Sequence, residues 1–239
     1  MSRELRADFQ KLHDFFSKYN LLPVLANGDF ITILSQQHKK YYSYLTCIAE
    51  LLHQKENGNI GYTISKDKQF AFIVESCSDI GNAIFLMANG SYKAAKLMQR
   101  SSIETFIKGF NLDEIPNIDS EKSVYKIFDN VKAANFFGTS PSKEILSEIH
   151  HMYKRLCADT HTASAVNMQH ITALKYFPAF SKKLSISVSD NCMQLVSAYI
   201  TLLVLKFTKE FKQMDYRNKE VILLSIPKQY KKLVQGIKL

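Results

Sequence analysis

The chain has 239 residues, of which 46% are hydrophobic and 22% are charged, an ordinary composition for a globular protein. Only eight residues are glycine and five are proline, and this scarcity of chain breakers favours long helices over many short strands and turns. The net charge of +9 favours nucleic acid or another polyanion as a partner. A basic surface that only keeps the protein in solution is the alternative.

Apolar residues recur at helical spacing along most of the chain. Near the N-terminus, five apolar side chains fall on one stripe: Leu5, Phe9, Leu12, Phe15 and Phe16. We therefore expect an all-α fold, a single bundle of about seven helices. The pattern predicts these helices at residues 3–19, 35–54, 68–88, 92–110, 120–136, 140–160 and 188–213.

Capping residues mark several of the predicted helix ends. Ser35, Ser120 and Asp190 are candidate N-caps, because their side chains can accept a hydrogen bond from the first turn. Asn89 and Gly90 suit the end of the third predicted helix, because glycine readily adopts the left-handed conformation that commonly follows a helix.

The last part of the chain differs in character. Residues 221–226 (VILLSI) form a short apolar run before Pro227, which is compatible with a short C-terminal β element. Lysines follow it, so we divide the chain into a helical bundle domain, 1–215, and a basic C-terminal tail, 216–239. We interpret this end as a solvated tail, with an RNA contact or a docking segment as alternatives.

Cysteine usage and hydropathy predict a cytoplasmic protein with no membrane partner. The four cysteines are far apart and include no Cys-x-x-Cys pair, which indicates reduced, buried thiols. The most apolar run, Met193 to Leu205, is too short to span a bilayer and predicts a buried central helix.

The segment from Tyr153 to His161 combines residue types that act on phosphodiesters. A histidine transfers protons near neutral pH, and an arginine can hold a phosphate and offset the charge that builds on it. Together they suffice for metal-free cleavage of RNA, in which the 2′-hydroxyl is the internal nucleophile. We predict Arg155 as the phosphate clamp and His161 as the proton-transfer group, with no cofactor.

Helix geometry sets a condition on this pair. Arg155 and His161 are six residues apart, which places them about 120° apart on a straight helix. They converge only if the helix ends or bends between them, or if a second subunit supplies one of them. Thr160 and Thr162 are poor helix formers, so we expect an end near residue 160. A surface arginine and an unrelated histidine at a helix end are the alternative.

The Arg-x5-His spacing resembles that of HEPN domains, helical bundles marked by Arg-x4–6-His late in the bundle. Two further features are similar to bacterial families of this kind. One is the spacing of Tyr153, Leu156 and His161. The other is an Arg-x-x-x-Glu pair, Arg100 and Glu104, in a helix with small and apolar residues before the arginine.

The resemblance covers about residues 68–210 and implies a metal-independent endoribonuclease or an RNA-binding protein. It also implies a homodimer, in which two Arg/His pairs face each other across a cleft, and a role in bacterial toxin–antitoxin or anti-phage systems. The chain departs from the pattern at Leu156, where many HEPN motifs carry a polar residue. A non-catalytic helical module that binds RNA or a partner protein is therefore the alternative.

Nearby side chains are candidates for supporting roles. Arg155 and Asp159 are four residues apart and are expected to pair on a helix. Arg100 and Glu104 have the same spacing, and they either pair at the surface or, partly buried, orient the face that carries Tyr153. We assign Tyr153, Arg100, Glu104 and Asp159 to this supporting set.

A metal centre is a second alternative. Two Glu-x-x-His pairs match the spacing of di-metal carboxylate bundles, in which two single glutamates complete the site. Their order along this chain differs from the usual alternation of single glutamates and Glu-x-x-His pairs. The candidate ligands are Glu50, His53, Glu75, Glu104, Glu148 and His151.

Overall fold

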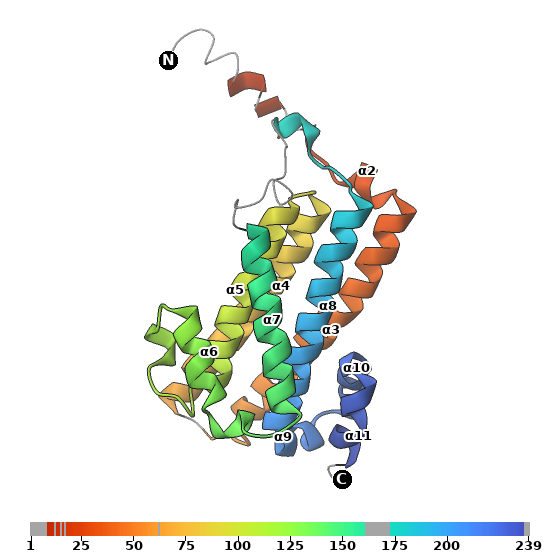
Figure 1. The fold of residues 1–239 in the computed structure, drawn as a ribbon. Coiled ribbons are helices and arrows are strands. Elements are labelled where there is room, and N and C mark those ends of the chain that lie inside the picture. The colour runs from red at the N-terminus through yellow and green to blue at the C-terminus, as the bar shows by residue number, and fades with distance from the viewer. Residues whose placement is uncertain are drawn as a thin grey trace.

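Figure 1 shows a helical bundle in the computed structural model, which describes residues 9–11, 13–14, 16, 18–61, 63–160 and 173–236. These residues contain no strand, so the predicted all-α fold is confirmed. In chain order the elements are α2 (Leu22–Leu25), α3 (Gly28–Glu56), α4 (Ile64–Ala88), α5 (Tyr92–Asn111), η1 (Ile118–Ser120), α6 (Val124–Lys132), η2 (Asn135–Phe137), α7 (Ser142–Thr160), η4 (Leu174–Tyr176), α8 (Lys182–Lys206), α9 (Thr208–Gln213), α10 (Tyr216–Ser225) and α11 (Lys228–Gly236).

Helix α8 is the buried central helix that its composition predicted. Every side chain from Leu195 to Val204 is buried. The Tyr199 ring stacks on Phe106 of α5, with ring centroids 4.0 Å apart, and its hydroxyl lies 3.2 Å from the Ser102 hydroxyl. Helices α4 and α8 are both long and apolar enough to cross a membrane, and 44% and 72% of their apolar stretches are buried inside the bundle. Packing inside the bundle accounts for the apolar composition of α8.

Several predicted helix starts are wrong, because other side chains supply the caps. Ser35 and Asp190 lie inside α3 and α8, and Ser120 lies in η1. Asn27 accepts a hydrogen bond from the first turn of α3, and Ser181 does the same for α8. Of the predicted helix at 3–19, the described residues from 9 to 18 are helical, and the others lie outside the described part.

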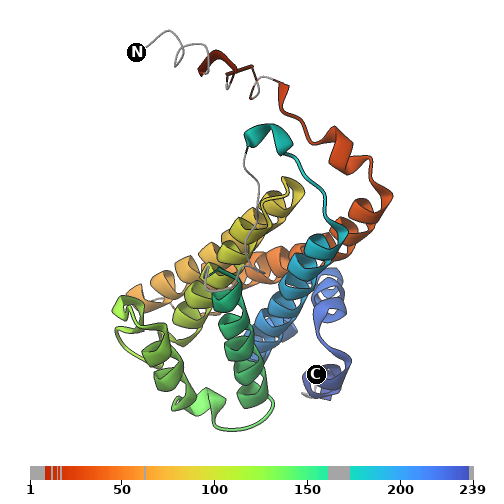
Figure 2. The same ribbon diagram turned by 45° about the horizontal axis from the view of Figure 1, so that its top comes forward.

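The predicted C-terminal strand and solvated tail are both wrong. Residues 221–225 lie in α10 and Ile226 is its C-cap, while the N-cap Asp215 accepts hydrogen bonds from two backbone amides. Ile222 and Ile226 are four residues apart and both are buried in the main core. Tyr230 and Val234 repeat this spacing on α11. Apolar residues at helical spacing therefore fold this segment onto α3 and α8, as Figure 2 shows.

The turn between α4 and α5 is in close contact with the segment before α8. Asn89 and Gly90 end α4 as predicted, and Gly90 has φ of 78°. The Tyr92 hydroxyl donates to the Ala179 carbonyl (3.1 Å) and accepts from the Ser181 amide (2.7 Å). A Cβ atom on Gly90 would lie 2.3 Å from the Ala179 carbonyl oxygen.

We expect Gly90→Ala to lower the free energy of unfolding by more than about 2 kcal/mol, because an L residue in this conformation already costs about 1–2 kcal/mol. The clash with Ala179 adds to that cost. Gly58→Ala is the matched control, since Gly58 has φ of 77° but no atom within 4 Å of its would-be Cβ. Denaturant unfolding of both variants checks this, and equal losses would show that the contact with Ala179 contributes nothing.

Candidate functional site

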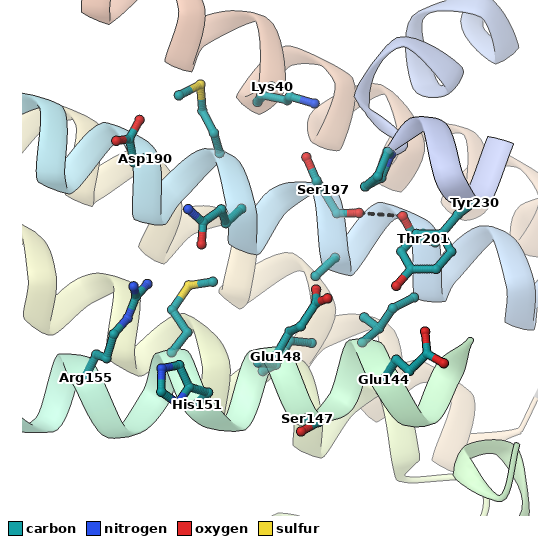
Figure 3. Close-up of a pocket in the computed structure, with 17 residues that line it drawn as sticks. Lys40, Glu144, Ser147, Glu148, His151, Arg155, Asp190, Ser197, Thr201 and Tyr230 are labelled. Carbon is teal, nitrogen blue, oxygen red and sulfur yellow. Dashed lines mark hydrogen bonds between the residues drawn. The ribbon is translucent and has the colours of Figure 1, made fainter. Parts of the chain in front are cut away.

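A pocket of about 720 Å³ lies between α7 and α8 (Figure 3). Lys40 of α3 borders it on one side, and Pro227 and Tyr230 close one end. Apolar side chains that include Ile145, Ile149, Met152 and Ala198 also line it. Its size and its mixture of apolar and polar lining are typical of a small-ligand site.

Most of the polar lining comes from one stripe on each helix. On α7 the stripe is Glu144, Glu148, His151 and Arg155, and on α8 it is Asp190, Gln194, Ser197 and Thr201. Both stripes have the spacing 4-3-4, which keeps side chains on one face of a helix. The two helices run in opposite directions, so Arg155 and Asp190 mark one end of the pocket and Glu144 and Thr201 the other (Figure 3).

The guanidinium of Arg155 is held at the edge of this pocket. Its Nη2 atom donates to Asn191 Oδ1 at 3.1 Å, and Asn191 is itself 9% exposed. A guanidinium has five N–H donors, and this is the hydrogen bond that it makes within the described residues. In Figure 3 the side chain reaches from α7 into the pocket. Within the described part of the chain, no other residue occupies the remaining donors.

His161 lies outside the described residues, so its distance from Arg155 stays a prediction. A different imidazole shares the pocket with Arg155. His151 precedes it by four residues and also lines the pocket, with its ring close to α7 in Figure 3. The sequence offers His151 only as a ligand in the metal alternative, although its spacing from Arg155 places both residues on one face of a helix.

The predicted supporting residues face away from this pocket. Arg100 donates to the Tyr153 hydroxyl at 2.8 Å, and that hydroxyl donates to Glu104 at 3.2 Å. Arg100 also pairs with Glu104 at 3.1 Å and donates to Cys157 at 3.3 Å. Tyr153 and Arg155 lie about 200° apart around α7, so this network faces α5 while Arg155 faces α8. This network links α5 to α7 and is partly buried. It therefore matches the second of the two predictions for Arg100 and Glu104, in which they are partly buried beside Tyr153.

The predicted ion pair between Arg155 and Asp159 is wrong. Asp159 binds the Lys96 ammonium of α5 at 2.7 Å, while Arg155 turns to Asn191 of α8. Spacing of four residues permits a pair on one helix, but a neighbouring helix supplied each side chain with another partner.

The di-metal alternative is also wrong. Within the described part of the chain, no three histidine, cysteine, aspartate or glutamate side chains come together to hold a metal ion. Glu50 accepts a hydrogen bond from Asn218 of α10, and Glu104 binds Arg100. Glu148 and His151 instead line the pocket between α7 and α8.

The cysteine prediction is confirmed for three of the four side chains. Cys47, Cys77 and Cys192 are buried and free, and burial raises the pKa of each to about 12. Cys157 is partly exposed and accepts a hydrogen bond from Arg100. The three buried thiols are therefore protonated packing groups rather than nucleophiles.

Carboxylates dominate the end of the pocket opposite Arg155. Burial, followed by repulsion from Glu144, raises the pKa of Glu148. Burial likewise raises the pKa of Tyr230, with contributions from both carboxylates. An anion is therefore repelled from the end near Tyr230, whereas the other end carries one guanidinium, that of Arg155, and one carboxylate, that of Asp190.

We expect Glu148→Gln to raise the melting temperature slightly at neutral pH. A raised pKa means that the folded state binds the proton more tightly than the unfolded state, so stability falls as pH rises through that pKa. Glu148 keeps solvent contact, so the gain is small, about 1–2 °C. Thermal unfolding checks this, and the gain should vanish below about pH 3, where the wild-type carboxyl group is protonated in both states. A lower melting temperature at neutral pH would contradict this explanation.

No protein-family model, curated protein or solved structure matches this chain. The likeness to HEPN domains therefore stays a prediction from short motifs.

Proposed function

We propose that this protein binds RNA at the Arg155 end of the pocket between α7 and α8 and cleaves it without a metal ion. The observation that carries the proposal is the anchored guanidinium of Arg155, which has an imidazole, that of His151, on the same face of α7. An arginine that is positioned by a neighbour and open to a ligand is suited to a phosphate oxygen.

The chemistry needs one phosphate contact and one group that moves protons. The imidazole removes the proton of the ribose 2′-hydroxyl, whose oxygen attacks phosphorus and expels the 5′-oxygen, which takes up a proton. The products are a 2′,3′-cyclic phosphate and a 5′-hydroxyl. Arg155 offsets the negative charge that develops on the phosphate oxygens. His161, from the Arg-x5-His motif, and His151, from the pocket, are the two candidates for the proton-transfer group.

RNA binding without cleavage is the second candidate function. Leu156 is fully buried in the core, at the position where many HEPN motifs carry a polar residue. The chain therefore brings no additional polar group to the phosphate from that position. In this case Arg155 still contacts RNA, but no RNA is cleaved and neither histidine has a catalytic role. The homodimer and the role in toxin or anti-phage systems belong to the same resemblance and are proposed with it.

The deciding experiment measures cleavage of mixed single-stranded RNA by the full chain in the presence of EDTA. The proposal expects cleavage products that end in a cyclic phosphate, together with saturable RNA binding. Binding without cleavage would select the second candidate function. Absence of both would reject the proposal.

A further inference from the structure

The hydroxyl of Tyr230 is an unpartnered polar group inside the pocket. Tyr230 is 6% exposed, and its hydroxyl has no hydrogen-bond partner within the described residues. In Figure 3 its ring reaches into the pocket toward Glu148. A buried hydroxyl without a partner destabilises a fold, so this position indicates a ligand that supplies one.

Two carboxylates share that end of the pocket. Glu144 and Glu148 are four residues apart on α7 and both line it. Neither forms an ion pair in the part of the chain that the structure describes, although the protein has an excess of nine positive charges. The Lys40 ammonium also lines the pocket, but it donates to the Ser225 carbonyl of α10 at 2.9 Å. Like charges at this spacing repel each other, and a bound cation would relieve that repulsion.

The surfaces around these carboxylates are apolar. Ile145, Ile149, Ala198 and Pro227 line the same end of the pocket, and all except Pro227 are buried. They offer contact area to methylene groups, as lysine stems find on other apolar surfaces. A site in which carboxylates lie next to apolar side chains is suited to a cation that carries an alkyl chain.

We propose that Glu144, Glu148 and Tyr230 bind a primary ammonium group on an alkyl chain, supplied by a free polyamine or by a lysine side chain. An ammonium has three N–H donors, which match two carboxylates and one phenol oxygen. A divalent metal ion fits less well, because no third acidic, histidine or cysteine ligand joins these two carboxylates among the described residues. The site is separate from Arg155 and does not depend on RNA binding.

Calorimetric titration of the full chain at fixed ionic strength tests this site, with spermidine and Nα-acetyl-lysine methylamide as the probes. We expect saturable binding of at least one probe by the wild-type protein. Glu148→Gln should weaken it about tenfold or more, because the glutamine oxygen still accepts a hydrogen bond from the ammonium but no longer carries a negative charge. Tyr230→Phe should weaken it a few-fold. Tighter binding of spermidine would identify a free polyamine as the source, and tighter binding of the lysine analogue would identify a lysine side chain.

Three controls make the result specific. Glu56→Gln removes an exposed carboxylate at the end of α3 and should leave the affinity unchanged. Arg155→Ala should bind the probe at least as tightly as wild type, since it removes a competing cation from the pocket. The melting temperature of Glu148→Gln, measured alongside, checks that this variant is folded. The proposal would be overturned if neither probe bound saturably, or if Glu56→Gln weakened binding as much as Glu148→Gln. It would also be overturned if Mg²⁺ bound at Glu148 more tightly than either probe.

Discussion

Replacing the proton-transfer histidine by alanine is expected to lower RNA cleavage by about 100- to 10,000-fold, the range of general acid–base catalysis. His151 and His161 are the two candidates, because one shares the pocket with Arg155 and the other completes the Arg-x5-His motif. Initial cleavage rates of His151→Ala and His161→Ala in EDTA check this. We expect one of the two variants to lose activity while its RNA affinity changes little.

His38 supplies the matched control for these histidine variants. It lies on α3, is exposed, and does not line the pocket. His38→Ala should therefore cleave RNA at the wild-type rate. Retention of full activity by both His151→Ala and His161→Ala would contradict the catalytic proposal, while leaving RNA binding to be judged separately.

Replacing Arg155 by alanine is expected to lower kcat/KM for RNA by about 100- to 1,000-fold, the usual loss when one group that stabilises a developing oxyanion is removed. The affinity for RNA should fall as well, since the same guanidinium contacts the phosphate in the bound state. Asn191→Ala should give a smaller loss, because it releases the guanidinium without removing it. Cleavage kinetics and equilibrium binding on the same RNA measure both effects.

Lys154→Ala is the matched control for Arg155→Ala. Lys154 is the preceding residue on α7 and is exposed, but it does not line the pocket. Both variants remove one positive charge from the same helix turn. Equal losses would mean that the protein attracts RNA through its net charge alone, and the pocket would then have no special role.

Most of the fold could be predicted from the sequence, because apolar residues recur at helical spacing along the longest helices. Scarce glycine and proline, with apolar residues at helical spacing, predicted the bundle and the buried centre of α8. The C-terminal error arose because residues 221–226 are a short apolar run, which periodicity alone cannot assign to a strand or a helix. The buried positions Ile222 and Ile226, together with Tyr230 and Val234, show that helical spacing applies there.

Only part of the candidate site could be predicted from the sequence. Helical spacing brought Tyr153 and Cys157 to one face, and the 4-3-4 stripes on α7 and α8 were present in the sequence. Which helices face each other is decided by tertiary packing, so the meeting of Arg155 with Asn191 and of Asp159 with Lys96 could not be inferred. Tyr230 joined the pocket only because α11 folds back onto α8.

A basic surface on α9–α11 is the alternative to the pocket as the location of the proposed RNA binding. Residues 208–236 contain three acidic side chains, Glu210, Asp215 and Glu220, against seven basic ones. The basic residues are Lys209, Lys212, Arg217, Lys219, Lys228, Lys231 and Lys232. Such a surface would bind any polyanion through charge, with a steep dependence on salt.

Photo-crosslinking of a 4-thiouridine-labelled single-stranded RNA to the full chain, followed by mass-spectrometric mapping of the attached residues, distinguishes these two locations most directly. The proposal predicts crosslinks on α7 around His151 and Arg155 and on α8 around Asp190 and Gln194, and their loss in Arg155→Ala but not in Lys154→Ala. Crosslinks confined to α9–α11, unchanged by Arg155→Ala, would contradict it.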